Sequence, residues 1–265
     1  MGIENVCLNA TLVCNEKCIY CFRGEGALFL NAEKAKVLVR TFRNLEIKKI
    51  NLTGGEPTLV PEIGLIINIF KKEGFIVSMT TNGTRFLPNL VEQLDWVSFS
   101  IDSLDKGILK KLGRSPILLD NVQKYLHYIR NKNLGVRVKI NSVFTAINST
   151  EENLISLADF INSNSDIVKR WKLFKFLPIR RAKSKSYLEI TEEKFNRLIF
   201  LAKKISNVKV SSGTKPHYII NYRGNYFELF QATEKGDKFL CKINLKGECY
   251  SDHTISSTID FQPVG

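Results

Sequence analysis

The chain has 265 residues, of which 44% are hydrophobic and 25% are charged, so it can bury a large core and is not intrinsically disordered. Its formal net charge of +13 makes nucleic acid a candidate partner, but the lysines are dispersed and are not interleaved with aromatic residues. An anionic small molecule or an ordinary solvated surface explains the charge equally well, and we disfavour nucleic acid. No signal-peptide pattern opens the sequence and no apolar run approaches the length of a bilayer span, so we expect a cytoplasmic protein without a membrane partner.

Short apolar strands alternate with amphipathic helices along the first 206 residues. Six strands are predicted, at residues 6–13, 47–52, 75–81, 96–101, 136–144 and 171–177. Helices are predicted at residues 31–45, 61–73, 117–132, 149–161 and 191–206. After residue 206 the alternation stops, and a hairpin around Arg223 and Gly224 is predicted, with strands at residues 218–222 and 225–230.

This alternation is typical of parallel βαβ units. Six strands are too few for a closed eight-stranded barrel, so we expect an α/β protein with a partial (βα)6 barrel of the TIM type over residues 1–206. Residues 207–265 would form a C-terminal extension whose hairpin covers the substrate site. Functional side chains in such sheets gather at the carboxyl ends of the strands, and the polar motifs of this chain fall there.

The first predicted strand leads into three cysteines with the spacing C-x3-C-x2-C, namely Cys14, Cys18 and Cys21. Three thiolates on one irregular loop can hold three irons of a [4Fe–4S] cluster and leave the fourth iron open. A structural zinc site needs a fourth protein ligand, and no further cysteine or histidine lies nearby in the sequence, although a zinc loop or inert cysteines remain the alternative. The other cysteines are interpreted as free thiols rather than as ligands of an auxiliary cluster: Cys7, Cys241 and Cys249.

A Gly-Gly-Glu-Pro segment at residues 54–57 directly follows the second predicted strand. Its two glycines would let the backbone approach a ligand closely, and Glu56 can accept hydrogen bonds from a cationic amine. The segment taken alone is also a plausible tight turn. Asn82, Ser100 and Asp102 follow at the ends of the next two strands, where each could equally be a turn or capping residue.

The cysteine spacing, with the aromatic Tyr20 before the last cysteine, resembles the signature of the radical S-adenosylmethionine (SAM) superfamily, and the Gly-Gly-Glu-Pro segment strengthens the resemblance. The resemblance implies that SAM binds the open iron of a [4Fe–4S] cluster and is split by one electron into methionine and a 5′-deoxyadenosyl radical. It implies that Ser100 and Arg114 hold the SAM carboxylate, residues 54–56 hold its amino group and Asn82 lies near its ribose. The implied SAM-binding residues are Tyr20, Phe22, Gly54, Gly55, Glu56, Asn82, Ser100, Asp102 and Arg114.

Five further segments resemble the viperin family in the same order along the chain, at residues 49–57, 100–103, 112–114, 139–143 and 170–174. This resemblance covers roughly residues 5–230 and implies dehydration of a ribonucleoside triphosphate, either CTP, UTP or GTP. The radical would abstract the 4′ hydrogen, and the 3′-deoxy-3′,4′-didehydro product would serve antiviral defence as a chain terminator. An electron donor of the flavodoxin or ferredoxin type is implied as a partner.

The expected substrate residues are basic or polar and come from three predicted strands: Lys49, Lys139, Asn141, Arg170 and Lys172. Lys139 and Asn141 alternate along one strand and point the same way, and so do Arg170 and Lys172 on the next. Such side chains would form a cationic pocket for a triphosphate, although edge lysines in solvent are the simpler alternative.

Three features depart from the viperin pattern. Asn9 and Arg23 occupy positions where that family carries histidines. Tyr222 and Tyr226 are both candidates for the catalytic tyrosine of its C-terminal hairpin, and either could instead be a packing residue. These departures leave another radical SAM reaction, such as peptide or cofactor maturation, as the alternative function.

Overall fold

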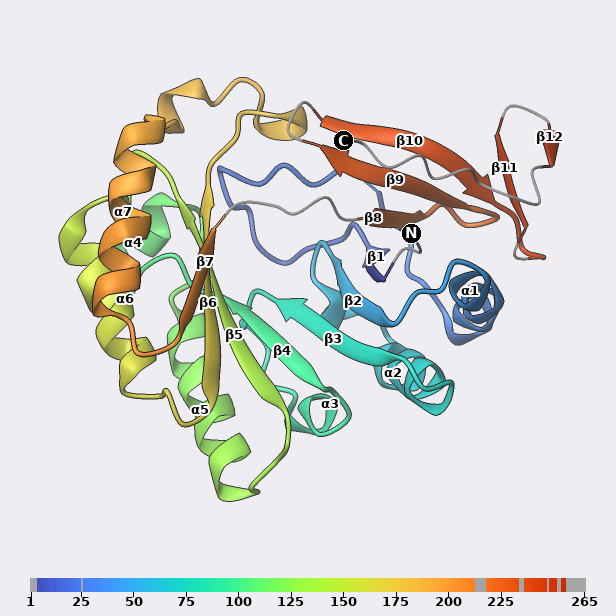
Figure 1. The fold of residues 1–265 in the computed structure, drawn as a ribbon, viewed down its shortest axis with the longest axis horizontal. Helices are drawn as coiled ribbons and strands as arrows, with labels where there is room; N and C mark the ends of the chain where they lie inside the picture. Colours follow the sequence, from blue (N-terminus) through green and yellow to red (C-terminus); the bar gives the residue numbers. More distant parts are fainter. Residues whose placement is uncertain are drawn as a thin grey trace. The chain divides into compact units, whose positions relative to one another are not determined.

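The structure is a computed structural model, which describes residues 4–24, 26–212, 218–233, 236–246, 248–251 and 254–255. The chain divides into two compact units, each built from separate stretches of sequence. The first unit contains residues 1–13, 25–79 and 215–265, and the second contains residues 14–24 and 80–214. Figure 1 follows the chain by colour through its alternating strands and helices.

The first unit combines parallel and antiparallel pairing. Its strands are β1 (Asn5–Thr11), β2 (Lys49–Gly54), β3 (Ile76–Thr81), β8 (Tyr218–Tyr222), β9 (Phe227–Thr233), β10 (Gly236–Ile243), β11 (Cys249–Ser251) and β12 (Thr254–Ile255). β1, β2 and β3 pair in parallel, and β8 joins the other side of β1, also in parallel. From β8 to β12 each strand pairs antiparallel with the next, so the predicted hairpin is present as β8 and β9 and continues as a meander.

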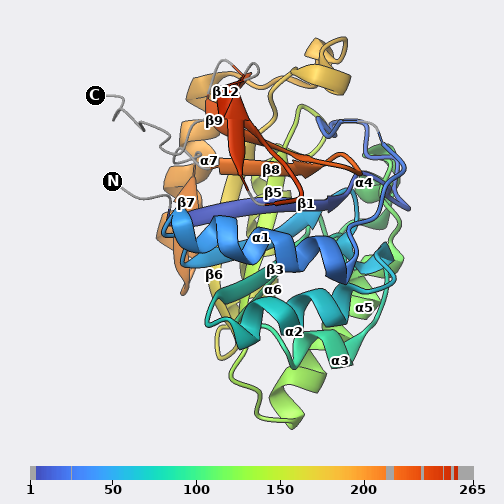
Figure 2. The ribbon, with the colours of Figure 1, turned by 90° about the vertical axis from the view of Figure 1, so that its right-hand side faces the viewer.

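Two helices of the first unit lie side by side (Figure 2), namely α1 (Ala32–Asn44) and α2 (Ile63–Lys72). Asn31 begins α1 as predicted, because its side chain accepts a hydrogen bond from the backbone N–H of Lys34. Phe42 of α1 lies 5.7 Å from Phe70 of α2 and 6.0 Å from Phe75, measured between ring centroids. This aromatic cluster buries the facing sides of both helices.

The second unit is a parallel α/β assembly. Its strands are β4 (Trp96–Ser100), β5 (Arg137–Phe144), β6 (Val168–Lys175) and β7 (Lys209–Ser212), paired in that order. Its helices are α3 (Pro88–Val91), α4 (Lys106–Lys111), α5 (Ile117–Asn131), α6 (Glu151–Asn162) and α7 (Glu192–Ile205), and its 3-10 turns include η2 (Arg180–Ala182) and η3 (Ser186–Leu188). Strand β7 pairs in parallel with β6, so the alternation continues one strand past residue 206, where the sequence analysis had ended it.

No helix in the described part of the chain is long and apolar enough to cross a membrane.

The main chain packs very closely where β1 and β2 of the first unit end. The backbone N–H of Gly55 donates to the Thr11 carbonyl at 2.7 Å, and that of Glu56 donates to the Val13 carbonyl at 2.8 Å. A Cβ atom at Gly54 would lie 2.0 Å from the Thr11 oxygen, and one at Gly55 would lie 2.0 Å from the Val13 oxygen. Gly54 also has a φ of +130°, which favours glycine. Both glycines are therefore required by the protein's own backbone.

Replacing Gly55 with alanine should lower the free energy of unfolding by about 2 kcal/mol or more, because the new methyl group meets a backbone oxygen that cannot move aside. Gly135→Ala is the matched control, since a Cβ atom there meets nothing within 4 Å. Urea denaturation of the two variants measures the difference. Equal stability of both variants would contradict the close packing of β1 and β2.

Candidate active site

The cysteine loop (residues 14–21) belongs to the second unit and has no regular secondary structure. Backbone hydrogen bonds fix it, because the N–H of Ile19 donates to the Leu112 carbonyl at 3.1 Å. Gly113 has a φ of +75°, and a Cβ atom there would lie 2.4 Å from the backbone oxygen of Lys17. The loop is thus pressed against the turn that follows α4. The three cysteines on it are half-buried and are not in disulfides: Cys14, Cys18 and Cys21.

A buried arginine ties this loop to the ends of the strands. Arg114 is 3% exposed, and all five of its N–H donors have partners within the second unit. The Nε atom donates to Glu16 at 2.6 Å, and Nη1 donates to Asp102 at 2.6 Å. The remaining acceptors are the Tyr20 hydroxyl at 3.1 Å and the backbone carbonyls of Asn82 at 3.1 Å and Ser100 at 2.9 Å.

Backbone N–H groups also donate hydrogen bonds to the two carboxylates beside Arg114. Glu16 accepts the N–H of Ser115 at 2.8 Å, and Asp102 accepts the N–H of Val143 at 2.8 Å. The Tyr20 hydroxyl donates to the same Asp102 carboxylate. Every charge of the network is therefore paired and hydrogen-bonded, which is the condition for keeping ions out of water.

Burial and charge shift the pKa values of these groups. Burial raises the pKa of Tyr20 well above its ordinary value, against the opposite effect of Arg114, so the hydroxyl keeps its proton. Burial alone would lower the pKa of Arg114, but Tyr20, Asp102, Cys18 and Glu16 raise it, so the guanidinium stays charged. Burial also raises the pKa of Cys18 to about 12, with Arg114 acting in the opposite direction.

The donor set suits an iron–sulfur cluster better than a single ion. A zinc ion needs its ligands gathered around one point at roughly 2.0–2.3 Å. Among the described residues, no three His, Cys, Asp or Glu side chains are gathered in that way. Thiols that bind three different irons of a cube lie farther apart, so Cys14, Cys18 and Cys21 could hold three corners and leave the fourth open.

The structure gathers five of the expected SAM residues around the cysteine loop: Tyr20, Asn82, Ser100, Asp102 and Arg114. Asn82 donates to the Asn15 side chain at 2.9 Å, and its Nδ2 atom lies 3.9 Å from the sulfur of Cys14. A SAM carboxylate could bind Arg114 only by displacing one of its five partners, so this role stays a prediction. Phe22, also expected at the SAM site, is 51% exposed.

The Gly-Gly-Glu-Pro segment belongs to the first unit. Glu56 is fully buried, and its carboxylate accepts from the N–H and the hydroxyl of Thr58 at 3.1 and 2.7 Å. The side chain thus begins the 3-10 turn η1 (Pro57–Leu59). Its part in binding SAM stays a prediction.

Four of the expected substrate residues share one face of the sheet in the second unit. The parallel register places Lys139 beside Arg170 and Asn141 beside Lys172, and residues two apart on a strand point the same way. Ser100 lies beside Asn141 on the other side. Asn141 is 9% exposed, and its Oδ1 atom has no hydrogen-bond partner among the described residues. A buried acceptor without a partner is rare in proteins and indicates a place for a ligand or water.

The basic side chains of this face also contact aromatic rings. The guanidinium of Arg170 lies 4.9 Å from the Trp96 ring, and that of Arg137 lies 5.4 Å from the same ring. The Lys172 ammonium lies 4.8 Å from the Phe174 ring. These contacts fix the cations in place without neutralising them.

The other expected substrate residues lie in the first unit. Lys49 is exposed at the amino end of β2, about 16 Å along the strand from Gly54 at its carboxyl end. Tyr222 ends β8, where its ring lies 5.3 Å from Phe227 and burial raises its pKa. The ring of Tyr226 lies 5.3 Å from the Lys242 ammonium.

The sequence analysis missed Glu16 on the cysteine loop and wrongly predicted the redox state of Cys241. Glu16 was not singled out, although an acidic residue between two cysteines is a signal of pairing with a cation, here Arg114. Asn9, which replaces a family histidine, donates to Asn221 at 2.5 Å. Cys241 was expected as a free thiol, but it is disulfide-bonded, so it cannot serve an auxiliary cluster in this state.

A family model described as the radical SAM superfamily matches residues 8–161. The chain is 29% identical over 250 residues to a protein of Flammeovirga pacifica named S-adenosylmethionine-dependent nucleotide dehydratase, with 84% of each chain covered. It is 36% identical over 149 residues to a protein of Pyrococcus horikoshii named probable GTP 3′,8-cyclase, which covers 53% of this chain and 47% of that relative.

The fold resembles the crystal structure of Streptococcus suis SuiB bound to S-adenosylmethionine, with a TM-score of 0.68 and 16% identity over 85% of this chain and 60% of that one. At this identity the likeness shows the fold alone. The expected α/β fold of radical SAM enzymes with a C-terminal extension is therefore confirmed.

Replacing Arg114 with methionine should lower the free energy of unfolding by about 3–5 kcal/mol, because two buried carboxylates would lose their cation. Arg130→Met is the control: its ion pair with Asp166 is exposed, and its loss should cost about 1 kcal/mol or less. Chemical denaturation followed by circular dichroism measures both. A small and equal loss in the two variants would show that the buried network is not what holds the loop.

Proposed function

Because the chain belongs to the radical SAM superfamily, whose cofactors are a [4Fe–4S] cluster and SAM, we propose that it is a nucleotide dehydratase whose cluster is held by Cys14, Cys18 and Cys21. The observation that carries the proposal is the cationic sheet face of the second unit, the unit that also carries the cysteine loop. The similarity to a relative named as a nucleotide dehydratase, along 84% of both chains, supports the same assignment.

When bound, the cofactors would supply the radical chemistry that removes the 4′ hydrogen of the substrate ribose. The protein's own residues bind and orient the nucleotide. Lys139, Arg170 and Lys172 neutralise a triphosphate, for which arginine offers a planar fork and lysine a point charge. Asn141 offers a buried acceptor to a ligand hydroxyl or amine. The 3′ hydroxyl would then leave as water, taking up a proton, and a second electron from the electron donor would give the closed-shell 3′-deoxy-3′,4′-didehydro nucleotide.

The finer parts of the proposal rest on the resemblance to viperins. The substrate is CTP, UTP or GTP, and the product acts as an antiviral chain terminator. Tyr222 and Tyr226 are the candidates for the catalytic tyrosine. Arg114, with its donors engaged, positions the cysteine loop through Glu16.

The reconstituted protein should cleave SAM to 5′-deoxyadenosine at least tenfold faster with one of CTP, UTP or GTP than without a nucleotide, because a bound substrate completes the site. An anaerobic assay of 5′-deoxyadenosine, with mass spectrometry of the nucleotide product, measures this, with ATP as the fourth nucleotide. The product should be lighter than its substrate by one water. No stimulation by any of the four nucleotides would end the proposal.

A second candidate is nucleotide cyclisation, favoured by the 36% identity with the probable GTP 3′,8-cyclase over about half of each chain. The mass of the product decides between the two reactions, because ring closure within the nucleotide keeps the oxygen that dehydration removes.

Replacing Asn141 with leucine should leave the thermal midpoint nearly unchanged, because its buried oxygen gives up no partner among the described residues. The KM for the nucleotide or for SAM should rise about tenfold or more, because the acceptor that the ligand uses is gone.

Asn148→Leu is the matched control, since Asn148 is also buried but donates to the Asp102 and Val143 carbonyls at 3.0 and 2.9 Å. This variant should lower the thermal midpoint by several degrees. An unchanged KM for both ligands in a stable Asn141→Leu protein would remove Asn141 from the site.

A further inference from the structure

Seven basic residues lie on the cysteine loop or on two segments of the second unit that pack against it, and we name them the basic collar. They are Lys17, Lys110, Lys111, Arg180, Arg181, Lys183 and Lys185. All are exposed except Lys185, which is half-buried. They come from the loop itself, from the last turn of α4 and from the segment that contains η2 and η3.

Close packing joins α4 to the loop. The backbone of Gly113 abuts that of Lys17, and Ile19 donates to the carbonyl of Leu112. Lys110 and Lys111 directly precede these two contact residues. The last turn of α4, which carries Lys110 and Lys111, therefore lies next to the loop segment that carries Lys17, between the first two cysteines.

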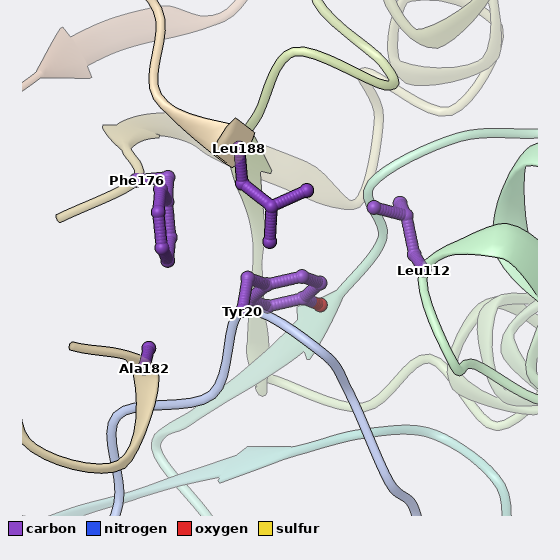
Figure 3. Close-up of a cluster of buried hydrophobic side chains, with 5 residues drawn as sticks. All are labelled: Tyr20, Leu112, Phe176, Ala182 and Leu188. Atoms are coloured by element: carbon purple, nitrogen blue, oxygen red, sulfur yellow. The ribbon is translucent and has the colours of Figure 1, made fainter. Parts of the chain in front are cut away.

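An apolar cluster joins the η2–η3 segment to the loop (Figure 3). Tyr20, the residue before Cys21, packs with Ala182, Leu188, Phe176 and Leu112. Ala182 lies between Arg181 and Lys183, so the burial of one small side chain holds two exposed cations at the flank of the cysteine loop. Cys18 and Ile19 pack against the same cluster.

Five of the seven collar charges lack an acidic partner among the described residues. Within the described residues, Lys17, Lys110, Lys111, Arg181 and Lys183 form no ion pair. Other exposed cations of the same unit do: Arg130 pairs with Asp166, and Arg197 pairs with Glu151. The exposed acids nearest in sequence are Asp105, which caps α4, and Glu189, which follows η3. The collar thus keeps a strong positive excess.

We propose that the basic collar is the docking surface of a small acidic electron-transfer protein of the flavodoxin type, which delivers the electron that SAM cleavage consumes. The inference rests on the proposed function only for the cluster held by the cysteine loop. One electron leaves the anionic flavin hydroquinone of the donor, which becomes the neutral semiquinone, and enters the cluster.

Three physical requirements favour this partner. The donor must bring its flavin close to the cluster, and the collar lies on the cysteine loop and on the two segments packed against it. Electron-transfer encounters use small, transient interfaces, for which unlike charges raise the association rate without demanding a large buried area. The exposed side chain of Tyr187, next to the collar, supplies the aromatic contact typical of such interfaces.

The test compares two double variants that change the net charge equally. The collar variant, Arg181→Glu with Lys183→Glu, reverses two of the collar charges. The α5 variant, Lys124→Glu with Lys132→Glu, reverses one exposed charge within α5 and one at its C-cap. Oxidised flavodoxin is the probe, and its Kd for the cluster-loaded protein is measured at about 0.05 and 0.5 M salt, across which charge pairing is screened. Bleaching of the cluster absorbance by reduced flavodoxin gives the rate of electron delivery, with dithionite as a donor that needs no docking.

The collar variant should raise the Kd for flavodoxin at low salt about tenfold or more, and slow flavodoxin-driven bleaching to a similar extent. The α5 variant should change both by about twofold or less, and dithionite should reduce the cluster equally in all three proteins. Normal reduction by dithionite also shows that the collar variant is folded and loaded.

Absence of binding to the unaltered protein, or equal weakening in both variants, would overturn the proposal. Binding of a labelled single-stranded RNA is measured with the same proteins. If the collar variant lost RNA binding and kept flavodoxin binding, the collar would be a nucleic-acid surface instead. None of these readouts uses a nucleotide substrate, so failure of the proposed dehydration leaves them interpretable.

Discussion

The buried pairing of Arg114 with Glu16 and Asp102 is the constraint on which the second unit's site depends. Removing three charges from water is costly, and the cost is met because all five guanidinium donors and both carboxylates are hydrogen-bonded. One side chain thereby connects the cysteine loop with Asn82 and with the end of β4, all within the second unit. The loop has one defined position because any other would leave a buried charge without a partner.

Much of the fold follows from periodicity in the sequence. The strands β1 to β6 and the long helices carry regular apolar patterns, and their observed bounds differ from the predicted ones by a few residues. Strand β7 was not predicted, because Lys209–Ser212 has four residues and a single apolar one, so its strand conformation comes from pairing with β6. The short helices α3 and α4 were missed for the same reason, since neither is long enough to show a helical period.

The candidate site was predictable where its chemistry is local and not where it depends on distant partners. The cysteine spacing and the polar strand ends can be recognised within a few residues of sequence. The ion pair between Arg114 and Glu16 cannot be recognised in this way, because the two residues are 98 positions apart in the sequence. Gly54 and Gly55 were interpreted as making room for a ligand, whereas the carbonyls of Thr11 and Val13 already fill the space that their side chains would need.

The same sequence separation has a consequence for how the protein is made. The three cysteines leave the ribosome early, but Phe176, Ala182 and Leu188, which pack around Tyr20, belong to a much later stretch of the chain. At about 5–20 residues per second, this delay is on the order of ten to thirty seconds. During translation the thiols are therefore present before the side chains that pack around Tyr20 and Cys18 in the finished protein. The iron–sulfur cofactor can meet the completed loop only after most of the chain has been synthesised.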